Sequence, residues 1–389
     1  MKIVIVLPRF PYPLEKGDKL RAYHQVAELS RENDIYLFAV SHKGVTEEQR
    51  EALAPYCKEM EVVTPPRWVS VKNVVRNYIA TKSLQLGYWD SQRARRRCRQ
   101  FVQRVKPDVV YSQMVRTMPL VARLDVPKVM DFQDALSMNT ERRMERSKGL
   151  WRHILHFEFK MLRSTEYKAF RVFNRLTIIS EADRDAIPHR ASDQIRVVPN
   201  GVDFDYFHPL DLPKNQDVVF CGNMQYKPNV DAATYLVREV MPLVWEKCPG
   251  ATVTLAGATP TGAVRALASE RVAVVGSPED IRPSYAQSRV FVAPMRMGSG
   301  LQNKLLEAMA MGVPCVTTPL ANQALGATPG QELLLGTDAA QLAGHIVALL
   351  GDEAMRNGLS ERASRFVRER FSWQSVGNQL NSILHEAVQ

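Results

Sequence analysis

The sequence predicts an α/β protein of two domains, each built around a mostly parallel sheet. Short runs rich in Val and Ile alternate with longer stretches of helical periodicity, which is typical of βαβ units. The chain has 389 residues, whereas a single hydrophobic core usually stops growing below about 250 residues. Its composition, 45% hydrophobic and 24% charged, is that of a globular protein that can fill two cores.

Two sets of predicted strands define these domains. Asn200-Gly201, a pair that favours a tight turn, and the polar stretch 211–217 separate the sets. We therefore expect a first domain over residues 1–203 and a second over residues 204–370. The predicted strands are Ile3–Leu7, Ile35–Val40, Met60–Thr64, Val109–Ser112, Val129–Phe132, Thr177–Ser180 and Ile195–Val198 in the first set, and Val218–Cys221, Thr252–Ala256, Val272–Val275, Val290–Ala293, Cys315–Thr317 and Leu333–Leu335 in the second.

Helical patterns follow the last predicted strand. Ala339–Leu350 and Asp352–Arg370 are expected helices, and we expect residues 371–389 to form a C-terminal helix that crosses back to the first domain. Open parallel sheets bind ligands at the carboxyl ends of their strands. We therefore expect the chemistry in a cleft on which the loops of both domains converge.

Composition and spacing exclude several other classes. Met1–Pro8 is too short for the apolar region of a signal peptide, and Arg9 follows it. No run approaches the ~18 apolar residues of a membrane-spanning helix, so we expect a cytoplasmic protein. The five cysteines lie far apart with no zinc-site spacing and are interpreted as reduced, structural thiols: Cys57, Cys98, Cys221, Cys248 and Cys315.

The most informative stretch is Ala293–Val316, which reads as strand, Gly-rich loop, helix, Gly-x-Pro stop and strand. Gly298 and Gly300 let the backbone approach a ligand closely, and the helix that follows offers unpaired N–H groups to phosphate. Lys304 and Glu307 are one turn apart, so both can face one site. The alternative is a surface ion pair worth ~0.3 kcal/mol.

This stretch resembles the family 4 glycosyltransferases, which have the GT-B fold of two Rossmann-like domains and retain the anomeric configuration. In that family a Glu of this helix binds the ribose hydroxyls of the donor, and Glu307 is the matching residue. Many members carry a second Glu before the Gly-rich loop, whereas this chain has no carboxylate there, so Arg296 or Lys304 is expected on phosphate instead. The donor-binding residues implied in this segment are Arg296, Gly298, Ser299, Gly300, Asn303 and Glu307, with Lys304 in a catalytic role.

A second segment, Val218–Asp231, runs from a strand through a Gly turn into a helix. Its Gly-Asn-Met-x-Tyr-x-Pro-Asn form resembles a subgroup of the family that is associated with exopolysaccharide synthesis. The resemblance implies donor contacts from Gly222 and Asn223, and an ordinary βα turn is the alternative.

The loop after the first strand carries Pro-x-x-x-Lys-Gly-Asp-Lys-x-Arg, which resembles the same subgroup. Gly17 matches the family's Gly near the donor diphosphate, and Arg21 lies one turn into the helix that follows. Both are therefore expected in donor binding. The alternative is a solvated basic helix start.

A fourth segment, Val129–Ser137, places two carboxylates, Asp131 and Asp134, directly after a strand. The subgroup has a similar Asp-x-x-Asp-x-x-Ser. Either carboxylate could orient the acceptor hydroxyl or accept its proton, so both are predicted as catalytic. Capping of the next helix is the alternative.

The first half of the chain carries most of the formal net charge of +10. Between residues 67 and 104, cations are interleaved with Trp and Tyr, and Asp90 is the only acid. This pattern suits an anionic membrane surface, where each cation contributes on the order of 1 kcal/mol. A solvated basic face is an equal alternative. Nucleic acid is not expected as a partner, because no recognition motif accompanies the charge.

Together these features predict a retaining glycosyltransferase that needs no metal or other cofactor, because Asp131 and Asp134 lie too far apart in the sequence to be assigned a metal. The resemblance implies a nucleotide diphosphate sugar as donor, bound by the second domain, and a glycan or lipid-linked acceptor on the side of the first. The resemblance also implies a role in cell-surface or exopolysaccharide synthesis. We expect the protein in the cytoplasm, and peripheral contact with the inner face of the plasma membrane is one of the two interpretations of its basic first half. The alternatives are a nucleotide-sugar epimerase of the same fold and a catalytically silent scaffold that binds polysaccharide or a partner.

Overall fold

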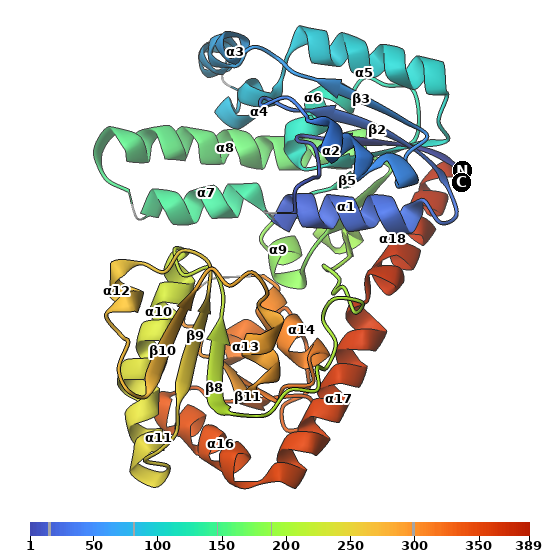
Figure 1. Cartoon of the computed structure of the whole chain (residues 1–389). Helices are drawn as coiled ribbons and strands as arrows, with labels where there is room; N and C mark the ends of the chain where they lie inside the picture. The colour runs from blue at the N-terminus through green and yellow to red at the C-terminus, as the bar shows by residue number, and fades with distance from the viewer. Residues whose placement is uncertain (15–16, 81, 146, 188, 298–299) are drawn as a thin grey trace. The chain divides into compact units, whose positions relative to one another are not determined.

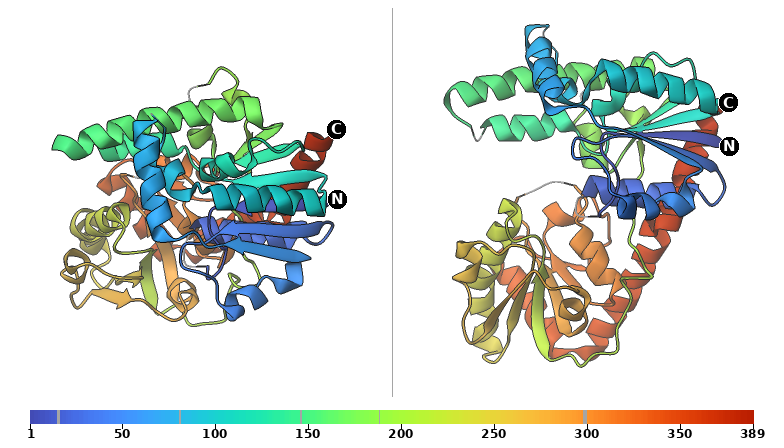
Figure 2. Two further views of the ribbon diagram at one scale, coloured as in Figure 1. Left: turned by 90° about the horizontal axis from the view of Figure 1, so that it is seen from above. Right: turned by 45° about the horizontal axis from the view of Figure 1, so that its top comes forward.

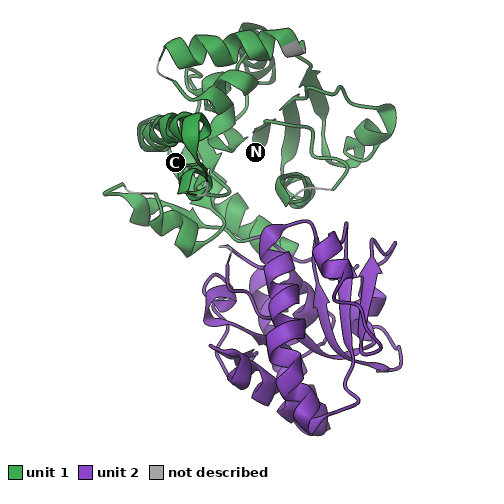
Figure 3. Cartoon of the chain, turned by 90° about the vertical axis from the view of Figure 1, so that its left-hand side faces the viewer, with its two compact units in different colours: residues 1–199, 373–389 green, residues 200–372 purple. Residues whose placement is uncertain are grey.

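The computed structural model describes residues 1–389 except 15–16, 81, 146, 188 and 298–299 (Figure 1). The chain divides into two compact units, which Figure 3 shows in different colours. Unit 1 comprises residues 1–199 and 373–389, and unit 2 comprises residues 200–372. Each unit has its own parallel sheet and its own hydrophobic core.

The sheet of unit 1 has seven strands in the order β3-β2-β1-β4-β5-β6-β7, and every neighbouring pair is parallel. Because β2 and β3 extend to one side of β1 and β4 extends to the other, the order reverses between β1 and β4. Ligand sites form at such a reversal. The strands are β1 (Lys2–Leu7), β2 (Asp34–Val40), β3 (Glu59–Val63), β4 (Val109–Gln113), β5 (Lys128–Asp131), β6 (Arg175–Ile178) and β7 (Arg196–Val197).

Ten α-helices accompany this sheet in the described part of unit 1, and Figure 2 shows them from two further directions. The C-terminal helix is one of them, since the contacts of residues 373–389 group with those of residues 1–199. The helices are α1 (Gly17–Leu29), α2 (Glu47–Glu51), α3 (Arg67–Ile79), α4 (Leu84–Trp89), α5 (Gln92–Val105), α6 (Met118–Val121), α7 (Leu136–Glu145), α8 (Gly149–Val172), α9 (Glu181–Asp185) and α18 (Trp373–Val388).

The two faces of this sheet are covered by different helices. Successive side chains of a strand point to opposite faces, and β1 follows that rule. Val4 and Val6 belong to a core that includes residues of α5 and α8. Ile3 and Ile5 belong to a second core with residues of α1 and α18. Unit 1 therefore has three layers, with the sheet between two layers of helices, and α18 belongs to one of these helical layers.

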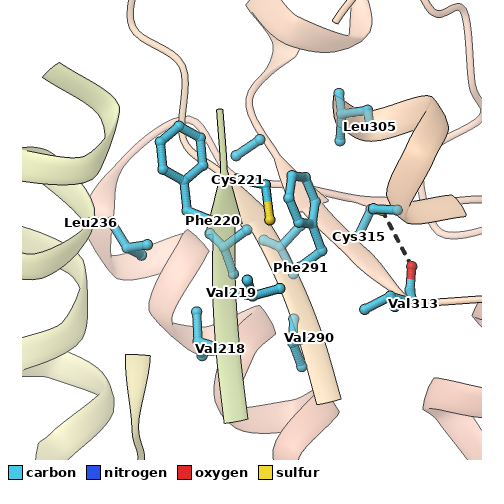
Figure 4. Packing of buried hydrophobic residues seen from close by; sticks show 14 of the residues in the cluster. Val218, Val219, Phe220, Cys221, Leu236, Val290, Phe291, Leu305, Val313 and Cys315 are labelled. Carbon is cyan, nitrogen blue, oxygen red and sulfur yellow. Dashed lines mark hydrogen bonds between the residues drawn. The ribbon is translucent and has the colours of Figure 1, made fainter. Parts of the chain in front are cut away.

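Unit 2 has a six-stranded parallel sheet in the order β10-β9-β8-β11-β12-β13. Its order reverses between β8 and β11, which lie side by side although β9 and β10 separate them in the chain. Buried residues of these two strands, among them Phe220 and Phe291, form the centre of the core (Figure 4). The strands are β8 (Gln216–Cys221), β9 (Val253–Gly257), β10 (Val272–Gly276), β11 (Ser288–Ala293), β12 (Cys315–Thr317) and β13 (Leu334–Leu335).

The helices of unit 2 connect these strands and then close the unit. The two long helical patterns at its end are present. The first ends one residue later than predicted, and both ends of the second are shifted by one residue. The helices are α10 (Lys227–Tyr235), α11 (Met241–Lys247), α12 (Gly262–Arg265), α13 (Arg282–Ala286), α14 (Asn303–Ala310), α15 (Pro319–Asn322), α16 (Ala339–Gly351) and α17 (Glu353–Phe371).

The predicted strands agree closely with the structure. All thirteen are present, and their ends differ from the expected ones by at most two residues. The fold class predicted from the sequence, two domains with parallel sheets, is confirmed. The five cysteines form no disulfide, and Cys98, Cys221 and Cys315 are buried. Within the described ranges, no helix has both the length and the apolar character needed to span a membrane.

Candidate functional site

A pocket of about 530 Å³ opens in unit 2 at the carboxyl ends of its central strands. Its walls come from the residues that follow β8, β9 and β10 and from α14, which follows β11. Small-molecule sites in proteins have volumes of roughly 300–1,000 Å³ and favour the reversal point of a parallel sheet. The lining includes Gly222, Asn223, Asn229, Gly257, Tyr285, Asn303, Lys304 and Glu307.

Glu307 is held in this pocket by a buried tyrosine. The hydroxyl of Tyr285, on α13, donates a 2.8 Å hydrogen bond to Oε2 of Glu307. Burial raises the pKa of Tyr285 well above its ordinary value, so the phenol stays protonated and remains a donor. Burial also raises the pKa of Glu307, while this hydrogen bond and the charge of Lys304 lower it. Among the described residues, none donates a hydrogen bond to Oε1 of Glu307, so that oxygen can accept from a ligand.

Lys304 lies in the same pocket, but it is not the ion-pair partner of Glu307. Its Nζ donates to Oδ1 of Asn229 at 2.5 Å and lies 5.3 Å from the centre of the Phe220 ring. Burial lowers the pKa of the amine to about 8, and the nearby carboxylate of Glu307 partly opposes that change. The alternative of a surface ion pair is therefore wrong. The two side chains bond to different protein partners and both line the pocket.

Asn229 connects Lys304 to the turn after β8. While its Oδ1 accepts from Lys304, its Nδ2 donates to the backbone oxygen of Asn223 at 2.9 Å. The side-chain amide lies so close to Gly222 that a Cβ there would be 2.7 Å from Nδ2. The predicted residues Gly222 and Asn223 thus shape the pocket wall. Asn229 is the last residue of the Gly-Asn-Met-x-Tyr-x-Pro-Asn motif, and the resemblance gave it no role in the site.

Gly257, at the end of β9, is a second residue that the sequence analysis missed. Its φ is +143°, and a Cβ would lie 1.9 Å from the backbone oxygen of Gly222. Only glycine permits this approach of the two strand ends. A glycine directly after the predicted buried strand Thr252–Ala256 is the signal that could have identified it.

The remaining predicted donor residues of unit 2 occupy different places. Asn303 begins α14, and its buried Oδ1 accepts no hydrogen bond from the described residues. Gly300 has a φ of +87°, which favours glycine. Gly298 and Ser299 lie outside the described residues. Arg296 is not among the pocket-lining residues.

Arg296 is instead bound on the surface of unit 2. It forms ion pairs with Asp231 at 2.9 Å and Glu239 at 3.4 Å. Its guanidinium also lies 4.1 Å from the centre of the Tyr235 ring. The predicted contact of Arg296 with the donor stays a prediction, and no contact in the structure supports it.

In unit 1, Arg21 and Asp131 form a fully buried ion pair. Nε of Arg21 lies 2.7 Å from Oδ2 of Asp131, and both side chains are 0% exposed. The guanidinium also donates to the backbone oxygens of Val198 and Pro199, while the Tyr111 hydroxyl donates to Asp131. This burial favours a structural role for both residues. Their predicted roles in donor binding and catalysis stay predictions without a supporting contact.

Asp134 differs from Asp131, because it is only half-buried. Burial and the negative charge of Asp183 raise its pKa to about 6, while the Arg116 guanidinium opposes the shift. The start of α7 is held by Glu166, which accepts from the backbone of Ser137 at 2.9 Å, and not by Asp134. Asp134 can therefore act as a base near neutral pH. Its catalytic role stays a prediction.

The loops beside Asp134 contain strained backbone. Met114 follows β4 with a φ of +62°, and Gln133 follows β5 with a φ of +63°. Side chains with a Cβ rarely adopt such angles, and strained residues gather at functional sites. Gly17, the first residue of α1, is exposed and has open space around its Cα. Its predicted contact with the donor stays a prediction.

Across the described ranges, no group of three or more His, Cys, Asp or Glu residues could hold a metal ion. Among the described residues that line the pocket, Lys304 is the cationic side chain, and the N-terminus of α14 also carries positive charge. Either can stabilise negative charge on a bound phosphate.

Two family models match the chain. Residues 20–206 match "Glycosyltransferase Family 4", and residues 215–352 match "Glycosyl transferases group 1". An uncharacterised 44.6 kDa protein in the cps region of Klebsiella pneumoniae is 22% identical, over 96% of this chain and 97% of its own length. The lipopolysaccharide core biosynthesis mannosyltransferase LpcC of Rhizobium leguminosarum bv. viciae is 25% identical, over 60% of this chain and 74% of its own.

Solved structures confirm the fold. The structure of HepE from Anabaena, in complex with UDP and glucose, matches with a TM-score of 0.66 and 17% identity, covering 98% of this chain and 99% of that one. The two family models together span both units, and the pocket lies within the second matched region. The chain therefore belongs to the family 4 glycosyltransferases and has their GT-B fold.

Proposed function

We propose that this enzyme transfers a sugar from a nucleotide diphosphate donor to a glycan or lipid-linked acceptor, with retention of configuration, in the cytoplasmic synthesis of a surface polysaccharide. The observation that carries the proposal is the position of Glu307 in the pocket of unit 2. Tyr285 fixes one carboxylate oxygen, which leaves the other to accept from the vicinal hydroxyls of a ribose. A charge-assisted hydrogen bond of this kind is about twice as strong as a neutral one.

The diphosphate would lie against the positive end of the pocket. Lys304 and the N-terminus of α14 point positive charge toward this region, where negative charge develops on the leaving phosphate as the glycosidic bond breaks. Asn229 positions Lys304 through its 2.5 Å hydrogen bond. We propose that these groups supply the charge stabilisation without a metal ion.

On the acceptor side, we propose Asp134 as the group that orients the acceptor hydroxyl or takes up its proton. A pKa of about 6 leaves most of this carboxylate ionised at neutral pH, while keeping it basic enough to accept a proton. Asp131 is the less suitable candidate, because it is fully buried and paired with Arg21.

The relatives support polysaccharide synthesis as the setting. One is described as a mannosyltransferase of lipopolysaccharide core biosynthesis, and another comes from a cps region. A UDP complex of HepE supports a nucleotide-linked donor. A nucleotide-sugar epimerase and a silent scaffold are the competing functions, and no contact in the structure favours either. An epimerase would change the donor without any acceptor, whereas a scaffold would bind no donor.

Thermal unfolding with UDP-, GDP-, ADP- and CDP-sugars tests the proposal. A ligand at 100 times its Kd stabilises the protein by roughly 2.7 kcal/mol, so one nucleotide should raise the transition temperature. Glu307→Ala should abolish that shift, whereas Glu361→Ala, at an exposed ion pair of unit 2, should keep it. If no nucleotide sugar changes the transition at millimolar concentration, the donor site is wrongly assigned and the scaffold becomes the better description.

A further inference from the structure

Helix α3 of unit 1 turns its polar side inward. Ser70, Asn73 and Asn77 recur along one face of the helix at spacings of three and four residues. Their exposed fractions are only 1%, 6% and 5%. A surface helix ordinarily buries its apolar face instead. The orientation of α3 therefore needs a specific cause.

Hydrogen bonds to neighbouring loops provide this cause. Nδ2 of Asn73 donates to the backbone oxygen of Asp90 at 2.5 Å, and Nδ2 of Asn77 donates to that of Ser83 at 2.9 Å. Turning the helix to bury its apolar side would leave the Asp90 oxygen without the donor that Asn73 provides, at a cost of about 1–3 kcal/mol. It would also remove one of the two donors to the Ser83 oxygen, which the backbone N–H of Gly87 still contacts at 3.1 Å. The polar contacts thus fix which side of α3 faces outward.

The outward side of α3 is apolar. Trp68, Val71, Val75 and Ile79 follow one another at spacings of three, four and four residues, and so form one stripe along the helix. They are 67%, 62%, 54% and 77% exposed. Tyr78, next to the stripe, is 55% exposed. Of the sixteen exposed large hydrophobic residues in the described part of the chain, these five lie within thirteen residues.

Exposed cations accompany this stripe on α3 itself, and others lie on α5. Lys72 and Arg76 are exposed on α3 itself. On α5, Arg93, Arg96 and Arg99 are exposed and form no ion pair with any described residue. Asp90 joins the two helices, since it pairs with both Arg76 of α3 and Arg95 of α5. Figure 1 shows α3 and α5 on the same side of unit 1, and in the view from above α3 lies in front of the unit (Figure 2).

We propose that the outer face of α3 docks on the surface of an anionic lipid bilayer. In this arrangement the helix lies in the plane of the membrane, with Val71, Val75 and Ile79 among the acyl chains. Trp68 and Tyr78, near its two ends, lie at headgroup depth, where such rings are favoured. The cations of α3 and α5 contact the lipid phosphates. This inference is independent of the proposed sugar transfer, since it uses no residue of the donor pocket.

The positive charge of α3 and α5 favours a membrane over a second copy of the chain as the partner of the outer face of α3. A symmetric contact through α3 would bring the cations of both copies together, and like charges at an interface are unfavourable. An anionic bilayer complements the same cations. The structure also revises the basic cluster on which a membrane contact was expected from the sequence. Arg95 and Arg97 pair with Asp90 and Glu61, so on α5 the cations available to lipid are Arg93, Arg96 and Arg99.

Sedimentation with vesicles tests the proposal on the full chain. Wild-type protein should bind vesicles of phosphatidylcholine and phosphatidylglycerol, and salt should weaken the binding. The triple variant Trp68→Ser/Val71→Ser/Ile79→Ser should partition about tenfold or more weakly, because interfacial binding grows with the apolar area inserted. The replaced side chains are exposed, so folding should be retained. Arg93→Glu/Arg96→Glu/Arg99→Glu should weaken binding to anionic vesicles in particular.

A matched control removes apolar area elsewhere. Val275→Ser/Leu320→Ser/Met355→Ser changes three exposed side chains of unit 2 and should bind vesicles like the wild type. Equal partitioning of the α3 triple variant and the wild type would overturn the proposal. So would a wild type that ignores vesicles but is dimeric in light scattering and becomes monomeric in the α3 variant, since a second copy would then cover the face.

Discussion

The buried ion pair of Arg21 and Asp131 allows a direct test of whether Arg21 serves the fold or the ligand. Both side chains are 0% exposed, and 2.7 Å separates Nε from Oδ2. Arg21→Met would leave a buried carboxylate with the Tyr111 hydroxyl and the backbone N–H of Gln133 as its remaining donors. Removing one partner of a buried pair costs about 3–5 kcal/mol.

The same substitution also removes the donors to the backbone oxygens of Val198 and Pro199. We therefore expect a loss of about 4 kcal/mol, which lowers the urea midpoint by more than about 1 M for slopes of ~1–3 kcal/mol/M. Urea unfolding followed by circular dichroism measures this shift. Arg21→Met/Asp131→Leu should cost less than the sum of the two single variants, by ~2 kcal/mol, because no charge stays unpaired.

Arg31→Met, in the turn just after α1, is the matched control. Its side chain is 61% exposed and pairs with Glu28, so the change should stay within about 0.5 kcal/mol. One result would refute the reasoning. If Arg21→Met unfolds at the wild-type urea concentration and yet binds nucleotide sugar tenfold more weakly, Arg21 is a ligand-binding residue and not a structural one.

Further expectations concern the pocket, its glycines and the acceptor side. Because the amine of Lys304 has a pKa of about 8 and is charged below it, nucleotide affinity should fall as pH rises through 8, as titration calorimetry from pH 6.5 to 9 would show. Gly257→Ala places a Cβ 1.9 Å from a backbone oxygen and should destabilise by roughly 2 kcal/mol or more, measured by the thermal transition. Asp134, with a pKa of about 6, must be ionised to accept a proton, so turnover should rise with pH through 6. Asp134→Asn should lose turnover while nucleotide binding is unchanged.

Each of these expectations has its own control and its own contrary outcome. Lys304→Arg keeps its charge above pH 8, so the nucleotide affinity of this variant should stay constant there. If the nucleotide affinity of the wild type does not change as pH rises through 8, the charge of Lys304 has no role in binding. Gly344→Ala lies in α16 with open space around it and should stabilise by about 0.5–1 kcal/mol. If Gly257→Ala unfolds at the same temperature as the wild type, the close packing of Gly257 against the backbone of Gly222 would be contradicted. Full turnover in Asp134→Asn would remove Asp134 from catalysis.

The sheets could be predicted from the sequence because buried parallel strands have a distinctive composition. Runs such as Ile3–Leu7 and Val218–Cys221 are rich in β-branched residues and bounded by loops. Glu307 could be identified as a candidate because Gly residues, a helix start and a Gly-x-Pro ending surround it in one stretch. These signals come from residues that are close together in the sequence. Such signals are enough to predict helices, strands and motifs that lie within one segment.

Contacts between distant segments could not be predicted in this way. Tyr285 lies on α13, a helix of five residues that is too short for a periodic pattern to reveal. The sequence suggested donor binding or a solvated helix start for Arg21, and neither interpretation includes the ion pair that Arg21 forms with Asp131 of β5. For α3, periodicity predicts a helix with a polar and an apolar side, but hydrogen bonds from Asn73 and Asn77 to other segments decide which side faces inward.

The place of α18 in unit 1 has a consequence for biosynthesis. A ribosome completes residues 200–372, a contiguous unit, before it makes residues 373–389, whose side chains Trp373, Leu380 and Leu384 belong to a core of unit 1. Unit 1, although it begins the chain, therefore cannot finish folding until residues 373–389 have been made. The core of unit 1 that α18 completes stays open to solvent while residues 200–372 are synthesised, and a chain cut before residue 373 loses part of the core of its first half.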